Sequence, residues 1–400
     1  MSLLTARSWL NICAAVAAAL SMGVMNPASV SAAPISDSAG SSRWVKVAEP
    51  RLDGANALDA VAAFGPRDVW AVGGHGVTGT SGEKPLAAHW DGQCWTRIEF
   101  PGSVPLHDVA GNSGKDVWAV GGRFDGSATT VQHWDGIAWS EVVHVGGTAD
   151  HPLVLDDVEA VSARDVWAVG YRGDLLSASG HAQHWNGVEW EESVVPQPEG
   201  ATTAVLTSVS SFGATNVWAS GFAFDGRRLT PYFVRWDGSR WSLVEVPSSI
   251  VGSYSAMTML GPDSFVAVGS DSSPGDPVPK AVVASFANGV WSQVALPITG
   301  GELNGVSPDG TGGVWVVGNR VGTGGHDDRH ALILRRQGSN WSVVPTPVTE
   351  AAGLSDVTVV PGSISAWSVG VAGVTDESHR SFILGYKVRI SSHGGGISEG

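Results

Sequence analysis

The sequence predicts an all-β protein folded as a seven-bladed β-propeller, with four antiparallel strands in each blade and an N-terminal strand that closes the last blade. Three observations predict this fold: a recurring motif, its regular spacing, and the absence of a helical hydrophobic period from every segment longer than one repeat. The motif Asp68-Val69-Trp70-Ala71-Val72-Gly73 recurs in seven versions, whose closing glycines are 48, 49, 51, 48, 49 and 52 residues apart. A four-stranded unit repeated about every 40–50 residues is typical of propeller blades.

The first element, residues 1–33, has the features of a secretory signal peptide. Arg7 is the only charged residue of this segment, and Leu10–Val24 is an apolar run rich in alanine. Small residues follow, so cleavage after Ala32 or Ala33 is expected. An uncleaved anchor helix is the alternative, but the apolar run is short for a membrane span. We therefore expect a secreted, extracellular protein with no membrane span after cleavage.

Cleavage would leave Cys94 as the only cysteine of the mature chain. A secreted protein with one cysteine has no internal disulfide framework, so its stability must come from packing. Residues 34–43 are expected to form a short linker before the propeller at 44–388, and residues 389–400 are expected to form a flexible tail rich in glycine and serine.

Each repeat predicts four short strands. A Leu-x-x-Val segment such as Leu58–Val61 comes first, and a turn rich in Gly, Pro and Asp separates it from the Val-Trp-Ala-Val-Gly strand. A loop of variable length then leads to a His-Trp strand. Asp91-Gly92 joins this third strand to a fourth one, Trp95–Ile98. An Asp-Gly dipeptide between two apolar runs is a strong signal for a β-hairpin.

The seventh repeat lacks its fourth strand, which identifies the seam of the ring. Its sequence ends after Phe382–Tyr386, whereas an unassigned strand of the right type, Trp44–Val47, stands at the other end of the propeller. If this strand completes the last blade, neither end of the chain leaves an open sheet edge. Residues 44–388 number 345, or about 49 for each of seven blades, in agreement with the repeat spacing.

The repeat resembles those of kelch and galactose-oxidase-like propellers. The similarity lies in an apolar strand, a Gly-Gly pair (Gly73-Gly74 and Gly121-Gly122), a variable loop, an aromatic residue, a short turn and a Trp. The sequence departs from typical kelch repeats because only four residues separate Trp90 from Trp95, and because the second glycine is absent after blade two. The resemblance implies a fold. It implies no single function, since the superfamily includes oxidases, glycosidases, lyases, lectins and scaffolds.

Composition excludes some partners. The chain has 38 acidic and 23 basic residues and a formal net charge of −15. A protein of this charge gains nothing from counterion release on nucleic acid and is repelled by an anionic membrane surface, so neither is an expected partner.

The tryptophans are the most distinctive residues of the composition. The 17 that follow the signal peptide fall into three columns of the repeat, represented in the first blade by Trp70, Trp90 and Trp95. They could form aromatic platforms for sugars, as in propeller lectins, or they could pack between blades. Packing is favoured, because a binding residue rarely recurs at the same register in every repeat.

A column of histidines, His89, His133 and His184, raises the question of a metal site. The three lie on third strands of successive blades, so their side chains are a blade width apart. Zinc needs donors that converge at about 2 Å from one point. A structural role is therefore favoured, and no metal site is predicted.

The candidate site is the column that follows the leading Leu of each repeat (Tyr in blade five), where every residue is polar while its neighbours in the Leu-x-x-Val pattern are apolar. Near the start of each innermost strand, these side chains should ring one mouth of the axial channel. They would bind a small ligand or a divalent cation, or else lock neighbouring blades together by hydrogen bonds to the backbone. The column consists of Asp59, His107, Asp156, Thr207, Ser255, Asn304 and Ser355.

A second set of candidates lies in the loops that follow the closing glycines, on the face where variable loops of propellers gather. Variable polar loops on a rigid scaffold commonly carry recognition. The His326–His330 loop is the densest cluster of charge, and it could coordinate a cation or simply be solvated. The loop candidates are Arg123, Arg227, Arg228, Asp327, Asp328 and His330.

Taken together, these patterns predict a secreted, monomeric binding module whose loop face recognises a glycan, a cell-envelope component or a protein. No cofactor is expected beyond the divalent cation considered for the channel mouth. The alternative is a secreted propeller enzyme, a polysaccharide lyase or a glycoside hydrolase. Against it, the sequence has no paired acids at motif spacing, no Ser/His/Asp arrangement and no metal signature.

Overall fold

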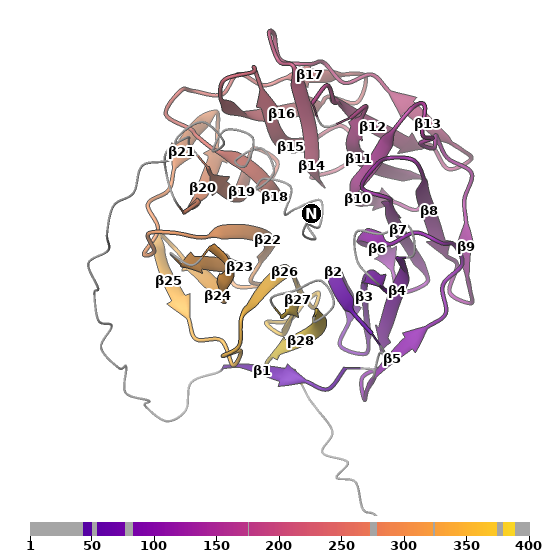
Figure 1. Ribbon diagram of the computed structural model, residues 1–400, viewed down its shortest axis with the longest axis vertical. Coiled ribbons are helices and arrows are strands. Elements are labelled where there is room, and N and C mark those ends of the chain that lie inside the picture. The colour runs from indigo at the N-terminus through magenta and orange to yellow at the C-terminus, as the bar shows by residue number, and fades with distance from the viewer. Residues whose placement is uncertain are drawn as a thin grey trace, which may run out of the picture.

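The computed structural model describes residues 43–49, 54–76, 83–174, 176–272, 278–322, 325–373 and 379–388. These residues form seven separate four-stranded antiparallel sheets, arranged as blades around a central axis (Figure 1). The prediction of an all-β, seven-bladed propeller is confirmed. The predicted signal peptide at 1–33, residues 34–42 of the linker and the tail at 389–400 lie outside the described residues.

The strands follow the same order in every blade, from the axis outward. The innermost strands are β2 (Asn56–Gly65), β6 (Leu106–Ser113), β10 (Leu153–Ser162), β14 (Thr203–Ser211), β18 (Ser253–Gly261), β22 (Glu302–Pro308) and β26 (Ala352–Val359). The second strands are β3 (Asp68–His75), β7 (Asp116–Gly122), β11 (Asp165–Arg172), β15 (Val217–Phe224), β19 (Ser264–Asp271), β23 (Val314–Gly322) and β27 (Ala366–Ala372). The third strands are β4 (Lys84–Trp90), β8 (Thr129–Trp134), β12 (Ser179–Trp185), β16 (Leu229–Trp236), β20 (Lys280–Ala287), β24 (Gly325–Gln337) and β28 (Arg380–Tyr386). The outermost strands are β5 (Trp95–Ile98), β9 (Trp139–Glu141), β13 (Trp190–Ser193), β17 (Trp241–Leu243), β21 (Val290–Gln293), β25 (Asn340–Val344) and, in the last blade, β1 (Trp44–Val47).

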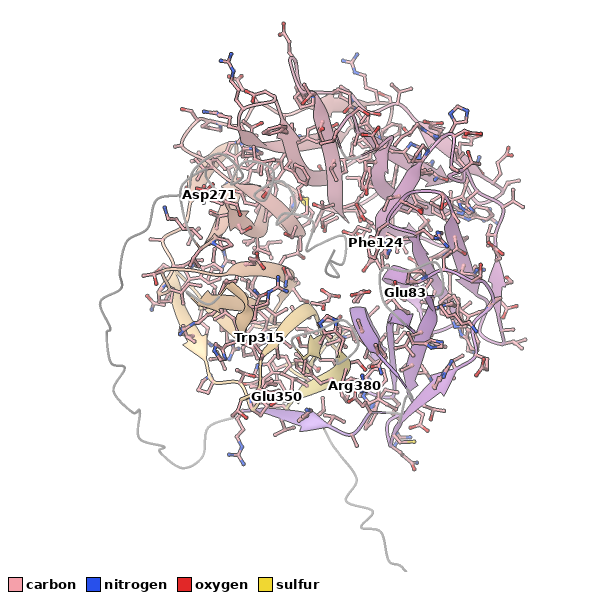
Figure 2. All side chains as sticks on the ribbon, in the orientation of Figure 1. Glu83, Phe124, Asp271, Trp315, Glu350 and Arg380 are labelled. Carbon is pink, nitrogen blue, oxygen red and sulfur yellow. The ribbon has the colours of Figure 1, made fainter. Side chains whose placement is uncertain are left out.

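The ring closes through β1, as predicted. β1 pairs antiparallel with β28, with Trp44 opposite Tyr386 and Val47 opposite Ile383, so the two ends of the propeller share one sheet (Figure 1). Trp44 is buried against the rings of Tyr386 and of Trp315 in the preceding blade. At the periphery, the Lys46 ammonium lies 3.2 Å from the carboxylate of Glu350, which Figure 2 labels beside β1.

The tryptophan columns pack between blades. The second-strand tryptophans, such as Trp70 and Trp118, are buried at 1–3% exposure. Each ring contacts aromatic rings of the following blade: Trp70 contacts Trp134 and Trp139, with ring centroids 5.1 and 5.2 Å apart. Trp367 of the last blade contacts Trp90 and Trp95 of the first blade in the same way. These contacts confirm that the columns are structural. Full burial of one aromatic side chain contributes about 2–3 kcal/mol or more, and edge-to-face pairs add to that.

The histidine column also has a structural role. His89, His133 and His184 each contact the aspartate that opens the second strand of their own blade, at 2.9, 2.7 and 2.7 Å. Each imidazole also lies against the second-strand Trp, with ring centroids 4.2–4.4 Å apart. In two other blades an arginine takes the place of the histidine: Arg235 lies over Trp218, and Arg335 lies over Trp315 and is bonded to Asp309.

A β-bulge near the start of every innermost strand explains the closing glycines. The pairing register between first and second strands shifts at the residue after the leading Leu or Tyr in all seven blades. The closing glycine pairs with that leading residue, as Gly73 does with Leu58. A methyl group on Gly73 or Gly170 would overlap the carbonyl oxygen of the residue that precedes the leading Leu. The bulge therefore requires glycine at this position in each blade.

Candidate functional site

The seven polar residues predicted to ring the axis are the extra residues of these seven bulges. Because a bulged residue has no partner in the ladder, its side chain can turn toward the neighbouring blade. Six of the seven are at most 9% exposed, and Asn304 is half-buried. The column is made up of Asp59, His107, Asp156, Thr207, Ser255, Asn304 and Ser355.

Three ring residues bond to the backbone of the following blade. His107 Nδ1 lies 2.8 Å from the carbonyl oxygen of Leu155, so Nδ1 is the nitrogen that carries the proton. Thr207 Oγ1 donates to the carbonyl of Tyr254 at 2.5 Å, and Asn304 Nδ2 donates to that of Leu354 at 2.8 Å. These bonds match the interblade role that the sequence left open beside ligand binding. Binding of a ligand or divalent cation by the ring stays a prediction.

His107 is the titratable base of this ring. Its imidazole is stacked on Phe124, with the rings 5.0 Å apart and 13° from parallel, and Figure 2 places Phe124 near the axis. Asp156 Oδ1 lies 3.9 Å from Nδ1. Burial lowers the pKa of His107 to about 4, so the imidazole is neutral at physiological pH.

A second layer of polar side chains follows one residue later along four of the seven innermost strands, at Asp108, Asp157, Ser208 and Asp356. Here the side chain accepts a hydrogen bond from a backbone amide of the following blade. Asp108 Oδ2 accepts from Val158 N at 3.0 Å, and Asp157 Oδ2 accepts from Val209 N at 2.8 Å. Asp356 does the same across the seam, accepting from Val61 N at 3.0 Å. These three aspartates link neighbouring blades, and their side chains lie close to the axis.

An axial cavity of about 440 Å³ is built from this second layer and from the residues beyond it. Its lining comes from the innermost strand of every blade and includes Phe64 and Asn112, which stand next to the turns that follow β2 and β6. The cavity therefore lies between the ring and those turns, on the side opposite the variable loops.

The lining is strongly acidic. Four carboxylates contribute to it, those of Asp108, Asp157, Glu159 and Asp356, and no Lys, Arg or His is among the described residues that line it. Serine and threonine hydroxyls and aliphatic side chains complete the wall. Carboxylates that share a confined space of low dielectric repel one another and attract a cation more strongly than they would in water.

Glu159, the fourth carboxyl group of the wall, also bonds to the following blade. Its Oε1 accepts hydrogen bonds from Ser211 N at 3.1 Å and from Ser211 Oγ at 2.5 Å, both in the following blade. Burial raises the pKa of Glu159 to about 7, with the charge of Asp157 adding to the rise and the bonds from Ser211 opposing it.

The predicted loop candidates come from blades 2, 4 and 6, which are not neighbours in the ring. Arg123 Nε lies 3.5 Å from Asp125 Oδ1. Arg227 and Arg228 are exposed, and their backbone amides donate to the carboxylate of Asp225. His330 is exposed, while the side chains of Asp327 and Asp328 lie outside the described part of the structure.

The four cavity carboxylates were not predicted from the sequence. Asp108, Asp157 and Asp356 each adjoin a predicted ring residue, so their polarity was visible. Regular alternation along a strand would place them on the opposite face from the ring, and only the bulge brings both layers toward the axis.

Among the described residues, no three His, Cys, Asp or Glu side chains are grouped so that they could hold a metal ion. No helix in the described ranges is long and apolar enough to cross a membrane.

The chain is similar in fold to solved propeller structures. One is "YCF48 bound to D1 peptide", at 11% identity and a TM-score of 0.54, covering 88% of this chain and 97% of that one. Another is YCF48 from Cyanidioschyzon merolae, at 16% identity and a TM-score of 0.55, covering 86% and 98%. No family model and no curated protein matches the sequence. The resemblance to kelch and galactose-oxidase-like repeats thus indicated the correct architecture, but these two neighbours are YCF48 propellers.

Proposed function

We propose that this protein is a protein-interaction module whose axial cavity receives a basic segment of its partner. The observation that carries the proposal is the composition of the cavity wall: four carboxylates and no basic side chain among the lining residues described. A lysine or arginine side chain entering the cavity would gain from several carboxylates at once, in surroundings where charges are poorly screened. The net charge of −15 would also speed the approach of a basic partner.

The class of partner is supported by a structural neighbour. One of the similar propellers is described as bound to a peptide. At 11% identity this likeness concerns the fold. A rigid ring with an axial cavity can hold an extended peptide without rearranging, which limits the entropy lost on binding.

The proposal includes export of the protein, which rests on the pattern of residues 1–33. N-terminal sequencing of protein expressed with its own leader should find a mature chain that begins at Ala33 or Pro34. Recovery of a cell-associated chain that retains Met1 or Ser2 would contradict cleavage and release of the protein.

A peptide library tests the proposed partner. Short peptides with a central Lys or Arg should bind, and the same peptides with the neutral isosteres norleucine or citrulline should bind at least roughly tenfold more weakly, since a lost charge pair in a confined site is worth about 1.4 kcal/mol or more. Binding should weaken with added salt. A glycan array in parallel tests the alternative that carbohydrate is recognised; glycan binding without any preference for basic peptides would overturn the proposal.

Variants connect binding to the cavity. Asp356→Asn removes one charge while its amide oxygen can still accept from Val61 N, so peptide affinity should fall several-fold with little change in unfolding temperature. Glu191→Gln is the matched control, because Glu191 is exposed on the outermost strand β13, far from the axis. Equal loss of affinity in both variants would show that general surface charge, and not the cavity, attracts the peptide.

A further inference from the structure

We propose that Glu159 is a proton-responsive residue of the axial cavity, which joins blades 3 and 4 in both of its protonation states and supplies a negative charge to the cavity only when deprotonated. The inference rests on the proposed function in one respect: the basic partner is what would make the change in charge consequential.

Glu159 is the one ionisable residue at its position in the seven repeats. It is the fourth residue after the leading Leu, and the equivalent residues of the other blades are neutral: Ala62, Ala110, Ser210, Thr258, Ser307 and Thr358. In blade 4 the neutral Ser210 performs the same structural task, since its Oγ accepts a hydrogen bond from Met259 N of the next blade at 3.1 Å. A hydroxyl therefore suffices to link two blades at this position. The carboxyl group of Glu159 adds an ionisable proton that the link does not need.

The link from Glu159 does not depend on its charge. Both bonds from Ser211 arrive at Oε1, and a protonated carboxyl group still offers its carbonyl oxygen as an acceptor while the proton resides on Oε2. Loss of that proton leaves the two bonds in place and strengthens them, because a carboxylate is the better acceptor. What changes between the two states is the charge that faces the cavity.

The groups around Glu159 favour the protonated state. On its own strand β10, Asp157 repels the carboxylate; β6 contributes Asp108 to the same wall, and β26 contributes Asp356. β14 has no charged side chain and presents serine hydroxyls, among them those of Ser210 and Ser211. On β11 the residue paired with Glu159 is Trp167, and the charged Asp165 of that strand is engaged with His184. Burial is the main reason that the pKa of Glu159 rises to about 7; the bonds from Ser211 oppose the rise, and the charge of Asp157 adds to it.

A basic side chain in the cavity would reverse this balance. The cation favours the deprotonated carboxylate, so binding should release a proton below neutral pH and become tighter as the pH rises through 7. Between pH 6 and pH 8 the fraction of ionised Glu159 rises from about one tenth to about nine tenths, given a midpoint near 7. Affinity for a lysine-centred peptide should therefore increase about three- to tenfold over this interval.

The titration can be measured without any partner. In protein labelled with ¹³C at the glutamate side chains, the carboxyl resonance that disappears in Glu159→Gln should titrate with a midpoint near pH 7. Ser211→Ala removes the Oγ bond that favours the charged form, so the midpoint should move upward in that variant. Should Glu159→Gln fail to fold, Ser211→Ala identifies the resonance instead. A midpoint below about 5.5, near the ordinary range of a glutamate, would overturn the proposal.

The binding arm uses the lysine-centred and norleucine-centred peptides with the wild type and Glu159→Gln at pH 6, 7 and 8. The wild type should bind the lysine peptide more tightly as the pH rises, whereas the affinity of Glu159→Gln should stay constant. If no basic peptide binds but the carboxyl group titrates near 7, the proposed partner is wrong and the proton-responsive residue stands. If the peptide binds and the variant keeps the full pH dependence, Glu159 is not its source.

Discussion

At the scale of single residues, the polar side chains around the axis divide into donors and acceptors. Ring residues such as His107 contact a carbonyl oxygen of the following blade, whereas second-layer residues such as Asp108 accept from its amides. Two consecutive residues of one strand thus bond to both kinds of backbone group, a carbonyl and an amide, on the innermost strand of the next blade. The cost of this arrangement is the burial of titratable groups, which makes the stability of the ring depend on pH.

His107→Asn tests that dependence. The folded-state pKa of His107 lies at about 4, below its ordinary value of 6.5. The contribution of the neutral imidazole to the free energy of unfolding is therefore fully present above pH 6.5 and is lost as the pH falls toward 4. Asparagine can donate to Leu155 O, as Asn304 does to Leu354 O, without taking up a proton. The variant should lose less of its unfolding temperature than the wild type between pH 6.5 and 4.5. Parallel curves for the two proteins would contradict a buried, neutral imidazole.

At the scale of elements, the inner strand with its bulge and the second strand with its glycine form one unit. The recurrence of a glycine at the end of Val-Trp-Ala-Val is evident in the sequence, and it predicts the end of a strand. Its reason is not evident there, because the bulge and the close approach of the two backbones exist only in the paired strands. Sequence patterns indicate which residues recur, whereas tertiary pairing decides where a local irregularity is placed.

Gly170→Ala should therefore be strongly destabilising. A methyl group there would overlap the carbonyl oxygen of Val154, a backbone atom of a buried residue on the paired strand β10 that cannot easily move. We expect a loss of about 2–4 kcal/mol of unfolding free energy, measured by urea denaturation. Gly65→Ala is the matched control, since nothing lies within 4 Å of a methyl group at Gly65. Because Gly→Ala at an unhindered position lowers the entropy of the unfolded chain and is not expected to destabilise, similar losses in both variants would contradict overlap as the cause.

The short strand β1 should contribute far more to the free energy of unfolding than its four residues suggest. Trp44 is 1% exposed, and Trp44→Ala would leave a cavity between Tyr386 and Trp315, at a cost of about 3–5 kcal/mol. Lys46→Ala in the same strand removes an exposed ion pair with Glu350 and a cation–π contact with Phe382, and should cost only about 1 kcal/mol. Chemical denaturation followed by tryptophan fluorescence distinguishes the two. Equal and small effects would mean that the seam does not hold the ring closed.

At the scale of the whole molecule, the seven repeats and the closing strand were predictable because each blade repeats the same local signals. Side-chain direction at the axis was only half predictable: the ring residues were identified by their polarity, but the cavity carboxylates require the bulge. Convergence of Asp108, Asp157 and Asp356 from three separate blades is a property of the closed ring, and no local pattern encodes it.

Stability of the folded ring should be independent of reducing agents. Cys94 is the one cysteine among the described residues, and it is exposed with a free thiol. Interblade aromatic packing replaces cross-links, so the unfolding temperature should be the same with and without dithiothreitol, and unfolding should occur in a single transition. A fall in unfolding temperature on reduction would reveal a disulfide that contributes to the fold. Cys94→Ser provides the control for intermolecular oxidation of the exposed thiol.

The interblade contacts share one direction. His107 contacts Leu155, Asp157 accepts from Val209, and Trp70 packs against Trp134, each reaching from one blade to the next along the chain. Such head-to-tail contacts are heterologous, and they are all satisfied only when the series returns to its starting point. A fragment of three or four blades would thus expose complementary surfaces at its two ends and would polymerise. Joining the present termini and opening the chain in another blade should, in contrast, preserve every contact, so the molecule should tolerate circular permutation.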